Sequence, residues 1–227
     1  MYSLLLLNGG VGKRVKAAGP KQFINIKGLP ILVYSLIAAD QEERITEIVM
    51  NYPEGYKEQV EDVVRRWAIK TPVILVEAGE TRHDSVRKLL DVSTNDKIII
   101  HEAARPLVTT ADFSELIDSE KENVSFMLPI SFTVAPVDPN KEQVTGYIER
   151  DKLRNVQLPQ KFDKKDLQEA HEWALKNNEK FTEDATLVAS FGRDVFYITG
   201  EDINFKITTP LDVQIATLLL EKNRPEE

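Results

Sequence analysis

The chain of 227 residues contains no cysteine, which excludes a disulfide framework, a thiolate metal site and a cysteine nucleophile. No apolar run approaches the roughly 20 residues that a membrane-spanning helix needs. No positively charged segment or small-residue cleavage site accompanies the first apolar run. Basic residues are outnumbered, and the net charge of −8 argues against binding to a nucleic-acid backbone. We therefore expect a cytoplasmic protein with no nucleic-acid and no membrane partner.

The sequence does contain short apolar runs, typical of buried strands, that alternate with amphipathic stretches typical of helices. The expected strands are 2–8, 46–51, 73–76, 97–101, 124–128 and 195–198. The expected helices are 30–39, 56–68, 81–90, 110–120, 164–176 and 210–221, with Thr109 or Thr110 as the cap of the fourth. This order predicts an α/β fold with a doubly wound, mostly parallel, Rossmann-like sheet in a single domain of residues 1–227.

One segment interrupts the alternation. Two strand-like runs, 132–137 and 143–148, flank the turn residues Asp138-Pro139-Asn140-Lys141, which predicts a β-hairpin. A two-stranded hairpin is marginally stable alone and needs a surface to pack on. We expect residues 131–150 to form a protruding β-arm that either folds back on the sheet edge or reaches a second subunit.

The most informative segment is the glycine-rich loop after the first strand, Asn8-Gly9-Gly10-Val11-Gly12-Lys13-Arg14. Its glycines expose backbone N–H groups that can surround an anion, and Lys16 and Lys21 add further positive charge. This combination indicates a nucleotide triphosphate site. No Gly-Lys-Ser/Thr ends the loop, so it is not a Walker A motif, and Val15 stands where a dinucleotide fingerprint needs its third glycine. An ordinary strand-to-helix turn remains the alternative.

Other loops follow strands as well. Residues 78–85 and 101–106 would lie at the carboxyl edge of the sheet, where ligands bind on open α/β sheets, and later candidate loops span 150–160, 181–185 and 204–206. Taken singly, each notable residue has a structural explanation. These explanations are a surface ion pair for Arg105, a helix cap for Thr182, exposed helix positions for His83 and His171, and a buried, hydrogen-bonded histidine for His101.

Taken together, in order and nearly end to end, these segments resemble the methylerythritol phosphate cytidylyltransferase family and its ribitol phosphate cytidylyltransferase relatives. The segments that carry the resemblance are Gly9-Gly10-Val11-Gly12-Lys13-Arg14, Pro20-Lys21-Gln22-Phe23, Gly79-x-x-Arg82-x-x-Ser85-Val86, His101-x-Ala103-Ala104-Arg105-Pro106, Pro159-Gln160-x-Phe162, Thr182-x-Asp184-Ala185 and Asn204-x-Lys206-x-Thr208. The resemblance implies an enzyme that joins CTP to a small polyol phosphate and releases pyrophosphate. It also implies an intertwined homodimer in which the arm reaches the partner's active site.

The resemblance assigns roles to individual positions. The implied catalytic residues are Arg14, Lys21 and Lys206. The implied nucleotide-binding residues are Asn8, Gly9, Gly10, Gly12, Gly79, Glu80, Arg82, Ser85, Ala103 and Arg105. The implied acceptor-binding residues are Thr133, Arg150, Thr182 and Asp184, with Arg150 supplied by the partner's arm. Glu102 matches the metal-linked acid of the family, for Mg²⁺ or another divalent cation that bridges phosphate oxygens.

The chain also departs from the family pattern. Glu102 stands where the family usually carries Asp, and Asn8-Gly9-Gly10 replaces Ala-Ala-Gly or Ala-Gly-Gly. Ser131-Phe132 replaces charged residues in the arm, and Leu158-Pro159-Gln160 replaces Thr-Pro-Gln. Because the acceptor side differs most, the sequence favours ribitol or glycerol phosphate, used in surface polysaccharide, over methylerythritol phosphate, used in isoprenoid synthesis. A nucleotide-binding protein without turnover and a Rossmann-type oxidoreductase are the alternatives of other classes.

Overall fold

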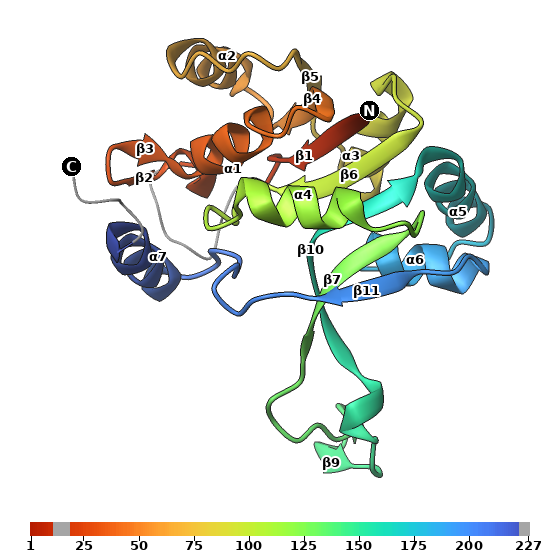
Figure 1. Ribbon diagram of the computed structural model, residues 1–227. Helices are drawn as coiled ribbons and strands as arrows, with labels where there is room; N and C mark the ends of the chain where they lie inside the picture. The colour runs from red at the N-terminus through yellow and green to blue at the C-terminus, as the bar shows by residue number, and fades with distance from the viewer. Residues whose placement is uncertain (11–18, 223–227) are drawn as a thin grey trace.

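The computed structural model describes residues 1–10 and 19–222. Within them lies a seven-stranded sheet with the strand order β11-β7-β10-β6-β1-β4-β5 (Figure 1). The strands are β1 (Tyr2–Leu7), β4 (Ile45–Tyr52), β5 (Val73–Glu77), β6 (Lys97–Glu102), β7 (Val124–Pro129), β10 (Arg154–Asp163) and β11 (Phe196–Thr199). β10 runs antiparallel to β6 and β7, and the other neighbours pair in parallel. The predicted mostly parallel α/β sheet is confirmed.

Helices cover both faces of the sheet because successive strand side chains point to opposite faces. Leu4 and Leu6 of β1 pack with α1 (Ile31–Asp40), α2 (Lys57–Arg66) and α4 (Thr110–Asp118) in one core. Leu5 packs with α3 (Arg82–Val92), α5 (Lys164–Lys176) and α6 (Asp184–Phe191) in the other. A third cluster joins α7 (Pro210–Lys222) to β2 (Asn25–Ile26), which pairs with β3 (Leu29–Pro30).

Two threonines are the N-caps of helices, a position that threonine favours. Thr109 caps α4 through a reciprocal capping box with Asp112, which confirms one of the two expected caps. Thr81 caps α3 in the same way with Asp84. The cap expected at Thr182 is wrong, because α6 begins one residue later than that cap requires. Its N-cap is Glu183, which makes no side-chain capping bond.

The loop expected at 150–160 is wrong for residues 154–160, which belong to strand β10. Polar residues and Pro159 make the segment unlike a central strand. The register of pairing with β7 shifts between Gln157 and Gln160, so Leu158 and Pro159 lie outside the regular hydrogen-bond ladder. The strand can therefore contain a proline. The polar side chains find partners only in the fold, as when Lys161 Nζ donates to Ser119 O at 2.7 Å.

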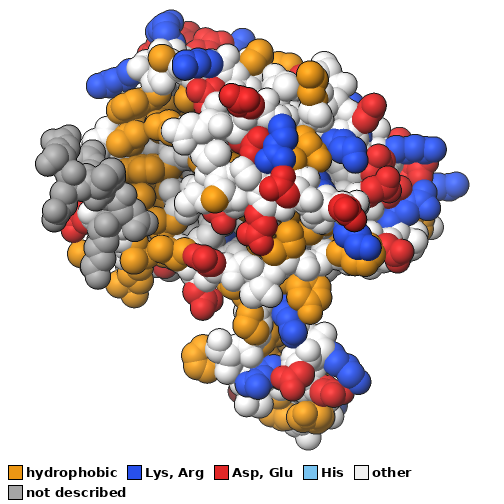
Figure 2. All heavy atoms as spheres, in the orientation of Figure 1, with side chains coloured by type: hydrophobic (Ala, Val, Ile, Leu, Met, Phe, Trp, Pro, Cys, Tyr) orange, Lys and Arg blue, Asp and Glu red, His pale blue; other side chains and the backbone are white. Residues whose placement is uncertain are grey.

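The arm extends away from the sheet, at the bottom of Figure 1 and of the space-filling view in Figure 2. The predicted turn is confirmed, but the paired strands β8 (Val137–Asp138) and β9 (Gln143–Val144) are much shorter than expected. Apolar side chains on the arm stay in solvent, with Phe132 84% and Tyr147 81% exposed. Within one chain, the arm therefore lacks an apolar core that could stabilise longer paired strands. A short 3-10 helix (Arg150–Lys152) leads back into β10.

No helix in the described part of the chain is both long and apolar enough to cross a membrane.

Candidate active site at the carboxyl edge of the sheet

A cavity of about 370 Å³ opens where β1, β4, β5 and β6 end. It brings together residues that the sequence placed in five separate segments. The predicted residues that line it are Asn8, Gly9, Gly10, Lys21, Gly79, Glu80, Arg82, Ser85, Glu102, Ala103 and Lys206. Gly12 and Arg14 lie outside the described residues.

The end of β1 forms one side of the cavity. The backbone N–H of Asn8 donates to Asn51 Oδ1 at 2.5 Å, and Gln22 Nε2 donates to the backbone O of Asn8 at 2.6 Å. A Cβ atom on Gly9 would lie 2.5 Å from Ala78 Cβ, so only glycine allows this approach between the loops after β1 and β5. The backbone at Asn8 and Gly9 is therefore held close to the end of β4 and to the loop after β5.

The turn before α3 forms the adjoining part of the cavity wall. The backbone N–H of Gly79 donates to Ser85 Oγ at 3.0 Å, and a Cβ on Gly79 would lie 2.7 Å from the backbone N of Ser85. Thr81 Oγ1 accepts from the backbone N–H of Asp84 at 3.0 Å, which fixes the first turn of the helix. The first turn of α3 thus reaches the cavity, and helix N-termini favour anions.

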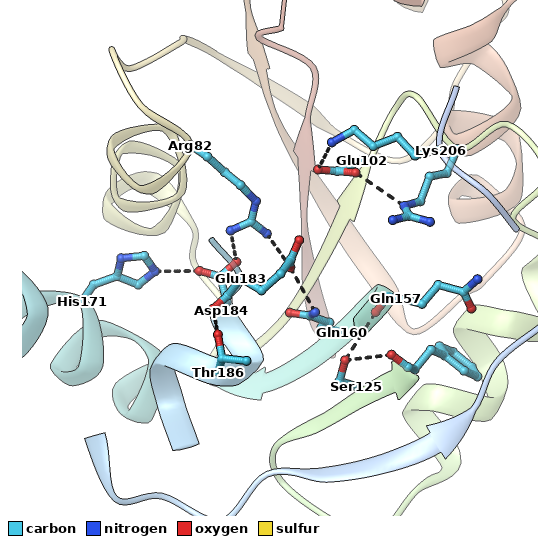
Figure 3. Close-up of polar contacts among 12 residues, drawn as sticks. Arg82, Glu102, Ser125, Gln157, Gln160, His171, Glu183, Asp184, Thr186 and Lys206 are labelled. Atoms are coloured by element: carbon cyan, nitrogen blue, oxygen red, sulfur yellow. Dashed lines mark hydrogen bonds and ion pairs between the residues drawn. The ribbon is translucent and has the colours of Figure 1, made fainter. Parts of the chain in front are cut away.

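Two lysines and one carboxylate occupy the third side. Lys21 Nζ donates to the backbone O of Ile207 at 2.6 Å. Lys206 Nζ donates to Glu102 Oε1 at 2.7 Å, and Arg105 Nε approaches Glu102 Oε2 at 3.4 Å (Figure 3). Burial would raise the pKa of Glu102, but the positive charges of Lys206 and Arg105 outweigh it and lower that pKa. Glu102 is therefore ionised, and the site is rich in cations.

Arg105 stands behind the cavity rather than in its lining. Its Nη1 donates to the backbone O of Asn204 at 2.9 Å, which ties the loop before Lys206 to the end of β6. Arg105 does form an ion pair, with Glu102, but the pair is largely buried and does not lie at the surface as expected, since the Arg105 side chain is only 12% exposed. Its predicted contact with nucleotide would then be indirect.

The carboxylates of the site suit a hydrated cation rather than an enclosed metal site. The described residues contain no cluster of three or more His, Cys, Asp or Glu side chains that could hold a metal ion. Mg²⁺ usually keeps several waters and binds substrate phosphates with one or two carboxylates. Glu102 is the buried carboxylate of the cavity and fits that role.

The predicted acceptor residues are not gathered in the cavity of one chain. Asp184 is fully buried, between Arg82 and His171, where no ligand reaches it. Thr182 is exposed beside the start of α6. Thr133 and Arg150 are exposed on the arm, where Arg150 Nη1 donates to the backbone O of Ser131 at 3.3 Å.

His83 and His171 differ from expectation. His101 is buried against Phe113, which confirms the predicted burial. Burial and the positive charge of Arg105 lower the pKa of His101 to about 3, so the ring is neutral. His171, expected to be exposed, is buried, and His83 is half-buried. The two rings are in contact because α3 and α5 pack together, with ring centroids 5.1 Å apart and planes tilted by 60°.

Sequence reasoning missed several polar residues of the lining, notably Gln22, Asn51 and Thr208. Gln22 and Thr208 stand inside motifs that were recognised, next to residues that received roles. Asn51 ends an expected strand at the same edge of the sheet as the glycine loop. Its polar character at that position was the available signal.

Comparison with known proteins agrees with this geometry. The family model described as 2-C-methyl-D-erythritol 4-phosphate cytidylyltransferase (IspD) matches residues 3–222. Proteins of that name from Bacillus pumilus and Bacillus cytotoxicus are 32% and 33% identical, over 98% and 99% of this chain and 98% and 100% of theirs. A crystal structure of 4-diphosphocytidyl-2C-methyl-D-erythritol synthase from Anaerococcus prevotii has a TM-score of 0.85 at 25% identity, covering 97% of this chain and 96% of that one. The chain therefore belongs to the 2-C-methyl-D-erythritol 4-phosphate cytidylyltransferase family and is a CTP-dependent nucleotidyltransferase.

Proposed function

We propose that the protein transfers the cytidylyl group of CTP to the phosphate of 2-C-methyl-D-erythritol 4-phosphate. The observation that carries this proposal is the cation-rich cavity between two glycine turns, which has the size of a small-molecule site. The full-length relatives named for this acceptor support it. Departures in the arm had favoured ribitol or glycerol phosphate, but the family model and these relatives favour methylerythritol phosphate, and we adopt it.

In the proposed reaction, an oxygen of the acceptor phosphate bonds to the α-phosphorus of CTP. The bond from that phosphorus to the oxygen bridging to the β-phosphate breaks, and pyrophosphate leaves. The acceptor phosphate is anionic at neutral pH, so the step needs no general base. It needs positioning and neutralisation of the charge that develops at the α-phosphorus. Lys21 and Lys206 would provide that positive charge from fixed positions.

We propose that Mg²⁺ binds with CTP, as the phosphate-bridging role requires. When bound, the ion would neutralise negative charge on the phosphate oxygens. Glu102 would hold it, either directly or through a water molecule. Because Lys206 and Arg105 keep Glu102 ionised, the carboxylate would be ready to receive a cation across the physiological pH range.

We also propose that the active form is a homodimer in which the arm of one chain completes the acceptor side of the other. Thr133 and Arg150 support this proposal because they lie on the arm and do not line the cavity of their own chain. The exposed apolar side chains of the arm, among them Phe132 and Tyr147, support it as well, since they lack a packing surface.

Pyrophosphate release with a panel of acceptors tests the proposed function. Methylerythritol 4-phosphate should react at least about tenfold faster with CTP than ribitol 5-phosphate or glycerol 3-phosphate, because a mismatched polyol leaves buried polar groups unpaired. ATP, GTP and UTP in place of CTP should support little turnover. Faster reaction with ribitol or glycerol phosphate would overturn the acceptor, and CTP binding without turnover for any acceptor would overturn the enzymatic role.

A further inference from the structure

Arg82 lines the cavity with two carboxylates behind it. It is the first residue of α3, and its side chain is 23% exposed. Its Nη2 donates to Glu183 Oε2 at 3.2 Å, and its Nη1 lies 2.7 Å from Asp184 Oδ2. Glu183 and Asp184 begin α6, so Arg82 joins the first turns of two helices that are far apart in the sequence (Figure 3).

Asp184 has a second partner on a third helix. His171 of α5 is 3% exposed, and its Nε2 lies 2.9 Å from Asp184 Oδ1. Burial would raise the pKa of Asp184, but Arg82 and His171 together hold that pKa well below its usual range. The carboxylate is therefore ionised and can only accept hydrogen bonds. His171 Nε2 must then carry the proton and donate it to Asp184.

The helices that carry His171 and Asp184 also pack through apolar side chains. Leu167 and Ala170 of α5 and Leu187 and Val188 of α6 share one apolar core. A buried ion pair adds little net stability, because the loss of hydration offsets the attraction between the charges. The contacts that run from His171 through Asp184 to Arg82 determine where the guanidinium of Arg82 lies. That position matters because Arg82 lines the same cavity as Lys21 and Lys206 and adds a positive charge to its wall.

We infer that Asp184 and His171 form a buried positioning pair that holds the Arg82 guanidinium in the cavity wall, where it binds the anionic phosphates of the nucleotide. The inference rests on the proposed function in taking CTP as the ligand. His171 donates to Asp184, Asp184 fixes Arg82, and Arg82 faces the substrate. Asp184 thus acts through Arg82 and does not touch the acceptor, in contrast to the role that the sequence resemblance implied.

A double-mutant cycle on CTP affinity tests this chain of contacts. His171→Leu removes the donor, and titration calorimetry should show CTP binding weakened by roughly tenfold, in line with the loss of a hydrogen bond to a charged group. His171→Gln keeps an N–H donor and should recover most of the affinity. In an Arg82→Ala background, His171→Leu should cause no further loss, because the residue that it positions is gone.

The controls separate this inference from structural and functional failure. His83→Leu removes a ring that lies tilted against His171 and is not among the hydrogen-bond or ion-pair partners of Asp184, and it should leave CTP affinity within about twofold of wild type. Far-ultraviolet circular dichroism confirms that each variant is folded. Fully additive losses of affinity in the cycle, or no rescue by His171→Gln, would overturn the positioning role while leaving the proposed function intact. A wild-type protein that does not bind CTP would overturn the proposed function itself.

Discussion

The cavity at the carboxyl edge of the sheet and the arm below it both carry predicted site residues, but they differ in how those residues are held. At the cavity, Lys21, Lys206 and Glu102 are hydrogen-bonded to parts of the same chain. On the arm, Thr133 and Arg150 are exposed, and the apolar side chains beside them have no partner surface. Among the described residues, the polar groups of the cavity are paired within a single chain, whereas the apolar side chains of the arm are left in solvent.

The difference shows how the two halves of the proposed site were built. The nucleotide side uses strand ends and glycine turns, where backbone groups are already ordered by the sheet. The arm, which carries the predicted acceptor residues, has only two short paired strands and exposed apolar side chains within one chain. A residue on the arm can then act at a fixed position only if another subunit provides the packing. Oligomeric state and catalysis would then be linked, and mixing variants of the two regions tests that link.

The largest expected effect comes from removing one residue on each side. Lys21→Ala and Arg150→Ala should each lower turnover by roughly two to three orders of magnitude, as the loss of a preorganised charge does. If Arg150 serves the partner's site, mixing the two inactive variants should restore activity to about a quarter of wild type. About half of the dimers are then mixed, and each has one intact site of two. Pyrophosphate release before and after subunit exchange measures this recovery.

The control for that mixture is Lys165→Ala, which removes an exposed lysine on α5, far from both regions, and should keep wild-type turnover. Subunit exchange is verified with differently tagged chains. A mixture that stays as inactive as its parents after complete exchange would mean that Arg150 serves its own chain. The contrast between cavity and arm would then lose its functional meaning.

A smaller effect concerns stability. Leu6→Ala empties a fully buried position beneath the cavity and should cost about 2–5 kcal/mol of unfolding free energy. Val144→Ala, at a position on the arm that is 63% exposed, should change it by no more than about 0.5 kcal/mol when the chains are dilute. Urea unfolding at low and high protein concentration measures both. A Val144→Ala cost that appears only at high concentration would indicate that a second chain covers the arm.

The smallest effect is a pH dependence that only the sheet interior should show. Lys161 is buried, and burial together with the charge of Lys97 lowers its pKa to about 8. The unfolded chain binds that proton up to about pH 10.4, so stability should rise between pH 8 and 10.4 and stay at its lower level below pH 8. The gain relative to Lys161→Met should be at most about 3 kcal/mol, measured by urea unfolding. An unchanged difference between the two proteins from pH 8 to 10.4 would contradict it.

A matched control for this measurement lies on the arm. Lys141 is 71% exposed at the hairpin turn, so it loses little hydration on folding. Lys141→Met should therefore follow the wild-type stability curve over the same pH range. A curve that departs from wild type as strongly as that of Lys161→Met would remove the distinction between the two regions.

Local rules predicted the parts of this molecule that depend on neighbouring residues. Apolar runs and helix periodicity placed the parallel strands and most helices close to their observed ends. Thr109 predicted the start of α4 because a capping box involves only residues three positions apart in the sequence. The cavity lies where the strand order implied, since the carboxyl ends of parallel strands meet at one edge.

The sequence by itself determined the α/β architecture, the glycine turns and the edge at which the cavity forms, because these follow from periodicity and local backbone geometry. Only the tertiary structure decided that polar, proline-containing β10 joins the sheet and that His171 and Asp184 are buried. It also decided that the arm remains largely unpaired within one chain. Each of these depends on whether distant residues supply a partner, as Arg82 does for Asp184. A buried polar group is stable only when such a partner is present, and the pattern of neighbouring residues carries no record of it.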